Sequence, residues 1–189
     1  MKSNSKLVLF VAFLVTITTL CKYFFGPSLV MSGITPMFAI ALFAGMVFKK
    51  KEWLFLFPLV SLFVSDLIIH GLYLSNQFDY AGVYGGQWKN YLILFASALV
   101  GWSLQAKSYK SLLAASFASP TLFFLASNFL VWTNTKEAVY TKTAAGLMTC
   151  YEAGLPFYRN SLLATLVFLP VVLVAFNWIN EGKKEVKLA

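Results

Sequence analysis

Two titratable side chains lie well inside an apolar run, and they are the first candidates for chemistry. Asp66 and His70 belong to the stretch PLVSLFVSDLIIHGLYL. Four residues apart on a helix, they would share one face with about 6 Å between them. Ionisable groups within apolar spans are costly and usually face the interior of a helix bundle. We therefore expect this pair to have either a functional or a structural partner.

The sequence carries no motif of a known reaction. Cys150 and His70 could combine as nucleophile and base, but no oxyanion-hole signature accompanies the cysteine. There is no H-E-x-x-H, G-x-S-x-G or Walker motif, and a single histidine excludes a His-rich metal site. We therefore expect no enzyme, no catalytic residue, no metal and no cofactor.

The composition is that of an integral membrane protein. The 189 residues are 59% hydrophobic and only 12% charged, whereas a soluble domain has about 25% charged residues. The mean hydropathy is +0.74. A soluble fold of this size cannot hide so much apolar surface, so the lipid bilayer must be one of its partners.

Apolar runs recur along the chain at lengths suited to crossing a bilayer. They predict an all-α, polytopic membrane protein with a single domain, residues 1–189, and a bundle of about six transmembrane helices. The predicted spans are residues 7–25, 34–48, 53–74, 91–104, 111–132 and 161–179.

The lysines predict the orientation of these spans. Short clusters such as Lys49 to Lys51 and Lys183 with Lys184 would all lie inside if the amino terminus is cytoplasmic. Both termini are then cytoplasmic, and the protein crosses the inner membrane several times with its long loops outside. The net charge of +8 reflects this topology and contact with anionic headgroups, so nucleic acid is not an expected partner. Cys21 and Cys150 both fall on the outer side, where a disulfide is conceivable.

Polar side chains converge on the outer half of the predicted bundle. Asn128, in LASNFLVW, lies at about the level of Asp66 and His70. One interpretation is an outward-facing ligand pocket oriented by these groups. The apolar walls would come from Trp132, Tyr151 and Phe157. The alternative is that Asp66 and His70 pair with each other, or with Asn128, to hold helices together.

The segment TAAGLMTCYEAGLPFYRN, residues 143–160, joins the last two predicted spans on the outer side. Gly154 and Pro156 are expected to break it into two short pieces. It is either an interfacial connector or a lid over the proposed pocket.

A run of small residues marks the helix FAIALFAGMVF. Ala41, Ala44 and Gly45 lie close together on it, which favours tight packing within the protein. The alternative is that this face docks a helix of a partner protein.

Several strings resemble an uncharacterised family of small bacterial integral membrane proteins, a domain of unknown function. They are ITPMFAIALFAGMVF, PLVSLFVSDLI, ASNFLVW and YTKTAAGLMTCYEAGLPFYRNSLLATLVF, and the resemblance covers nearly the whole chain from Ile34 onward. More weakly, the architecture is similar to the substrate-capture (S) components of energy-coupling-factor transporters. That resemblance implies a small-molecule ligand, an ATPase and a transmembrane coupling subunit as partners.

The leading prediction is therefore a small-solute-binding transport component. The alternatives are a non-transporting scaffold of an envelope assembly and, third, an intramembrane enzyme.

Overall fold

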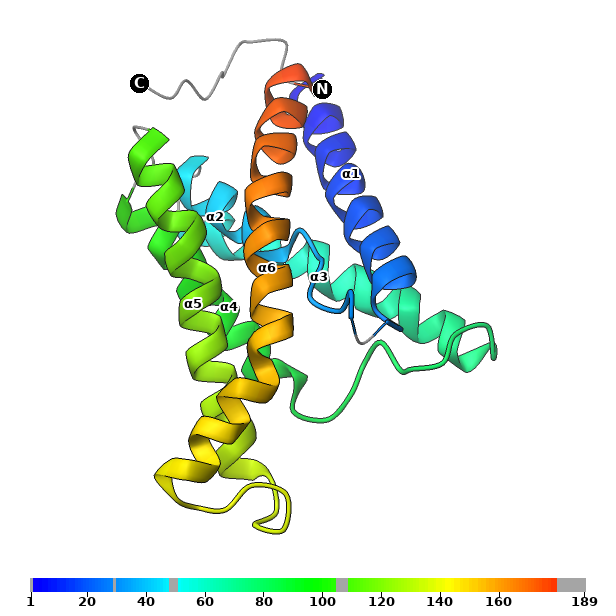
Figure 1. The fold of residues 1–189 in the computed structure, drawn as a ribbon. Helices are drawn as coiled ribbons and strands as arrows, with labels where there is room; N and C mark the ends of the chain where they lie inside the picture. The colour runs from blue at the N-terminus through cyan, green and yellow to red at the C-terminus, as the bar shows by residue number, and fades with distance from the viewer. Residues whose placement is uncertain (1, 29, 48–50, 105–108, 180–189) are drawn as a thin grey trace.

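The chain folds entirely into helices in the residues that the computed structural model describes, which are 2–28, 30–47, 51–104 and 109–179 (Figure 1). These residues form six helices and no strand. The helices are α1 (Lys2–Phe25), α2 (Met37–Val47), α3 (Lys51–Leu74), α4 (Gln87–Leu104), α5 (Tyr109–Asn134) and α6 (Ala144–Ile179). The all-α prediction is confirmed. Each predicted span overlaps one of these helices, although residues 34–36 of the second span precede α2 and residue 48 lies outside the described residues.

Four helices are long and apolar enough to cross a membrane. They contain the stretches Ser5–Phe25, Phe55–Leu74, Lys110–Asn134 and Ala144–Ile179, and about 20 apolar residues suffice to cross the hydrocarbon core. The length and apolar composition of these helices support the assignment of the chain as a multi-pass membrane protein. The start of α1 and the end of α6 lie at the same end of the bundle (Figure 1). Which side of the membrane this end faces stays a prediction.

The second predicted span is instead a short, central helix. With 11 residues, α2 is about 16 Å long, roughly half the thickness of a hydrocarbon core. All residues from Phe38 to Gly45 are buried, and α2 packs against α3, α4, α5 and α6. Its apolar composition thus reflects enclosure by other helices.

Glycines let α2 and α4 approach until their backbones touch. A Cβ on Gly45 would lie 2.4 Å from the carbonyl oxygen of Ala98, and one on Gly101 would lie 2.7 Å from that of Leu42. Ala41 and Ala44 are fully buried on the same helix. The three residues considered as a docking face for a partner helix are therefore covered by helices of the same chain.

The segment 143–160 is not a broken connector. From Ala144 onward it is helical without interruption, so the expected break at Gly154 and Pro156 is wrong. A proline inside a helix removes one hydrogen bond and bends the axis, and this need not end the helix. Figure 1 shows the change of direction in the yellow part of α6. With 36 residues, α6 is about 54 Å long, more than the roughly 40–45 Å of a bilayer with its headgroups.

An aromatic core joins α1, α2 and α6. The rings of Phe10, Phe43 and Phe176 meet pairwise with centroids 5.0 to 5.3 Å apart. Asn160 of α6 also holds the connection between α1 and α2, because its Nδ2 donates hydrogen bonds to the carbonyls of Val30 and Ser32 at 2.7 and 2.8 Å. The short helix α2 is thereby fixed in the centre of the bundle.

Candidate functional site

Asp66 is the centre of a buried polar network that joins three helices. The residue is 7% exposed. Its Oδ1 accepts a hydrogen bond from Nζ of Lys22 at 2.5 Å. Its Oδ2 accepts one from Nε2 of Gln87 at 2.8 Å and another from the hydroxyl of Tyr91. Lys22 also donates to Oγ of Ser65 at 2.6 Å. The network ties α1 and α4 to α3.

Every charged group of this network has its partner. The ammonium of Lys22 and the carboxylate of Asp66 compensate each other, which is what a buried ion requires. Tyr80 of the connection 75–86 donates its hydroxyl to the backbone carbonyl of Lys22 at 3.0 Å. Burial, and then the negative charge of Asp66, raise the pKa of Tyr80, so this phenol stays a hydrogen-bond donor. The arrangement suits a structural cross-link better than a titrating relay.

His70 belongs to a different environment from Asp66. Its Nδ1 accepts a hydrogen bond from the backbone N–H of Val83 at 3.4 Å, and its ring stacks on Tyr73 with centroids 6.0 Å apart. The two residues share a helix, but Asp66 pairs with Lys22 rather than with His70 or Asn128. His70 therefore holds the connection 75–86 against the end of α3.

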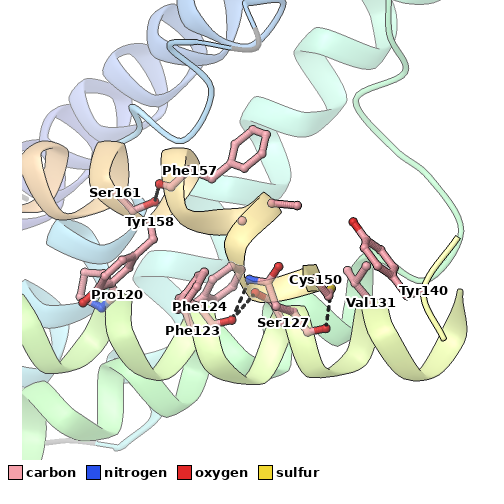
Figure 2. Close-up of a pocket in the computed structure, with 13 residues that line it drawn as sticks. Pro120, Phe123, Phe124, Ser127, Val131, Tyr140, Cys150, Phe157, Tyr158 and Ser161 are labelled. Carbon is pink, nitrogen blue, oxygen red and sulfur yellow. Dashed lines mark hydrogen bonds between the residues drawn. The ribbon is translucent and has the colours of Figure 1, made fainter. Parts of the chain in front are cut away.

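A separate cavity of about 390 Å³ lies between α5 and α6 (Figure 2). Its walls are mostly apolar and aromatic. They include Phe123, Phe124 and Val131 from α5 and Cys150, Gly154 and Phe157 from α6. Figure 2 shows Pro120 with Tyr158 at one end and Val131 with Cys150 and Tyr140 at the other.

Asn128 supplies the principal polar group of the cavity wall. Its Nδ2 donates to the carbonyl of Phe124 at 2.8 Å, while its Oδ1 has no partner among the described residues. The amide lies against Gly154, where a Cβ would come within 2.6 Å of Oδ1. Gly154 thus allows α6 to pass close to Asn128, and the backbone carbonyl of Asn128 accepts a hydrogen bond from Sγ of Cys150 at 3.4 Å.

The hydroxyls at the other end of the cavity satisfy each other. Oγ1 of Thr121 and the hydroxyl of Tyr158 are 2.7 Å apart. The ring of Tyr158 also stacks on Phe124, with centroids 4.7 Å apart. This end of the cavity consequently presents carbon surface.

The six residues predicted to surround one pocket lie in different parts of the structure. Asn128 and Phe157 line the same cavity, whereas Asp66 and His70 are not among its lining residues. Trp132 and Tyr151 lie on the helices that form it without lining it. Nε1 of Trp132 donates to the carbonyl of Thr141 at 2.8 Å, and the hydroxyl of Tyr151 donates to that of Leu125 at 3.1 Å.

The cysteines and the acidic residues among the described residues form no further centre. Cys21 and Cys150 are both free, buried thiols, so they do not form the disulfide considered from the sequence. Across the described part of the chain, no three His, Cys, Asp or Glu side chains are grouped to hold a metal ion.

A family model matches residues 1–187 and is described as a family of unknown function, DUF6580. The chain belongs to the DUF6580 family. This confirms the resemblance to an uncharacterised family. No curated protein and no solved structure matches the chain. The weaker resemblance of this DUF6580 protein to S components therefore has no support.

The network residues around Asp66 were missed by sequence reasoning. The sequence pattern does not single out Lys22, Gln87 or Tyr91 as partners of Asp66. One signal was present, since Lys22 lies within the last turn of the first predicted span, in the same half of the predicted bundle as Asp66. A buried carboxylate needs a cation, and Lys22 was the cation at that level.

Proposed function

We propose that this DUF6580 protein binds a small molecule within the membrane and that the cavity between α5 and α6 is the binding site. The observation that carries the proposal is the unpaired Oδ1 of Asn128 in the wall of a largely apolar cavity of about 390 Å³. Ligand sites typically have volumes of about 300–1,000 Å³, with a few polar groups in an apolar lining. Asn128 is the group that would orient the ligand.

We infer transport as the use of this site. In the topology predicted from the lysines, the connection between α5 and α6 is on the outer side, and Tyr140 of this connection lines the cavity. A ligand taken up at this level would be captured from outside or from the outer leaflet. Co-purification with an ATPase and a coupling subunit would support capture for active transport, whereas co-purification with envelope proteins alone would favour a scaffold.

Thermal stabilisation of the purified protein tests the binding proposal. A ligand that binds only the folded state raises the free energy of unfolding by about 2.7 kcal/mol at a hundredfold excess over its Kd, and the midpoint temperature of unfolding rises with it. We expect at least one member of a metabolite and lipid library to stabilise the wild-type protein in detergent.

Two alanine-to-leucine substitutions on α6 test whether the ligand that shifts the unfolding midpoint binds in this cavity. Ala153 lines the cavity and is itself exposed, so Ala153→Leu would narrow the cavity. Ala145 is exposed on the same helix and does not line the cavity, so Ala145→Leu is the matched control. We expect Ala153→Leu to abolish the ligand-induced shift and Ala145→Leu to keep it. A shift that survives in both variants would place the ligand elsewhere, and no shift from any compound would refute the proposal.

A further inference from the structure

The cavity between α5 and α6 contains no charged side chain among its described lining residues. Its polar groups are the amide of Asn128 and the hydroxyls of Ser127, Tyr140, Tyr158 and Ser161. A charged ligand would lose its hydration there without gaining a counter-ion, which is costly in an apolar setting. The lining therefore favours a neutral ligand.

The polar groups that lack protein partners lie toward one end of the cavity. Oδ1 of Asn128 and the hydroxyl of Tyr140 have none among the described residues. Tyr140 lies at the end of the cavity with Val131 and Cys150 (Figure 2), and the backbone carbonyl of Asn128 accepts a hydrogen bond from Cys150. At the other end, Tyr158 already bonds Thr121, and Pro120 and Phe123 present carbon. Along α5, Pro120 and Val131 are separated by about 16 Å. The cavity thus suits an elongated molecule with one polar end.

The rim of the cavity is continuous with surface that contacts lipid. Val131 and Phe157 line the cavity and are also 47% and 40% exposed. Both belong to helices long and apolar enough to cross a membrane, so the exposed part of such side chains meets lipid or the headgroup boundary. A ligand can therefore pass between the bilayer and the cavity without crossing water.

We propose that the occupant of this cavity is a neutral, single-chain amphiphile drawn from the bilayer. Its hydroxyl or carbonyl head lies at Asn128 and Tyr140, and its hydrocarbon chain extends along Phe124 and Phe123 toward Pro120. This inference rests on the proposed function, since it names the class of ligand for the same cavity.

Competition between chain-matched lipids tests this ligand class. The protein in detergent is incubated with equal amounts of monooleoylglycerol, which is neutral, and oleoyl lysophosphatidylglycerol, which is anionic, and bound lipid is counted by native mass spectrometry. We expect one monooleoylglycerol per chain, preferred over the anionic lipid by about tenfold or more. Ala153→Leu should lose it, and Ala145→Leu should retain it. Asn128→Leu should lower its affinity about tenfold, the value of one hydrogen bond to the head.

Protection of Cys150 gives a second readout that does not depend on these variants. In the Cys21→Ala background, Cys150 is the single thiol and lines the cavity. Monooleoylglycerol should slow its modification by N-ethylmaleimide, while glycerol, which has the head without the chain, should not.

Three outcomes would overturn the inference, and they differ in what they leave standing. Equal binding of the anionic lipid would contradict the neutral head, and protection by glycerol would contradict the chain. Stabilisation by a water-soluble metabolite, sensitive to Ala153→Leu, with no monooleoylglycerol bound, would refute the lipid but keep the proposed function. If no library compound stabilises the protein and no lipid binds in the competition experiment, both the lipid inference and the proposed function are refuted.

Discussion

Removing the carboxylate of Asp66 should destabilise the fold far more than removing an exposed carboxylate. In Asp66→Leu, the ammonium of Lys22 would keep only Oγ of Ser65 at 2.6 Å and the carbonyl of Leu62 at 3.4 Å. Breaking a buried ion pair by deleting one partner costs about 3–5 kcal/mol, because the remaining charge is left uncompensated. The hydrogen bonds from Gln87 and Tyr91 are lost in the same step.

The reciprocal substitution should cost less. In Lys22→Met, the carboxylate of Asp66 would still accept hydrogen bonds from Gln87 and Tyr91. We expect a loss of about 1.5–3 kcal/mol, the value of one hydrogen bond to a charged group. The double variant has no buried charge left, so its cost should fall short of the summed single costs by about 1–3 kcal/mol.

Thermal unfolding in detergent, followed by far-ultraviolet circular dichroism, measures these differences. For a chain of this size, a loss of about 3–5 kcal/mol lowers the midpoint by roughly 6–20 °C. Asp79→Leu is the matched control, because Asp79 is an exposed aspartate in the connection between α3 and α4, and its effect should stay within about 0.5 kcal/mol. Two results would refute the account of a compensated pair. One is a double variant whose cost equals the sum of the costs of Asp66→Leu and Lys22→Met. The other is a cost of these variants no larger than that of Asp79→Leu.

Three further predictions follow from close contacts. Gly45→Ala should lower the unfolding midpoint, because the new Cβ would meet the backbone of Ala98 and Trp102. Gly71→Ala is the control, since a Cβ there has nothing within 4 Å and should raise stability by up to about 1 kcal/mol. Equal effects of the two variants in thermal unfolding would contradict the α2–α4 contact. Tyr80→Phe should cost about 0.5–1.5 kcal/mol near pH 8. Because the pKa of Tyr80 is raised in the folded state, its proton contributes its full stabilisation below the ordinary tyrosine pKa of about 10. This contribution is lost as the pH rises above that value, so the difference between Tyr80→Phe and wild type should shrink only above about pH 10; a difference that stays constant there would refute this. Cys21 and Cys150 should both be alkylated quantitatively in sodium dodecyl sulfate without reductant and slowly in the folded protein, and mass spectrometry would expose a disulfide as a protected pair.

Helix identity was predictable because apolar runs of membrane length allow few other structures. Backbone groups in lipid must be bonded within the segment, so a long apolar run becomes a helix. The ends of α1, α3 and α5 fall within a few residues of the predicted spans for this reason. The start of α6 was missed by 17 residues, from Ser161 back to Ala144. Gly154 and Pro156 have low helix propensity, and packing of that stretch against α5 overrides it.

The candidate site was only half predictable. Asn128 and Phe157 were placed together because Asn128 lies near the end of the predicted span 111–132 and Phe157 lies in the segment 143–160 that follows it. Asp66 was assigned to the same pocket because depth in the membrane was the only coordinate available. Residues at one depth can point to different sides of a bundle, and sequence pattern does not give the rotation of α3 relative to α5.

Composition and periodicity by themselves determined that this protein is helical, apolar and built for the membrane, since those properties follow from local hydropathy and backbone bonding. Only the tertiary structure decided the partners. Lys22 and Asp66 are 44 residues apart along the chain, and Gly154 reaches Asn128 because α6 continues as a helix past Pro156. The enclosure of α2 and the cavity between α5 and α6 arise from the same cause, because which side chains meet depends on how the helices rotate and pack against one another.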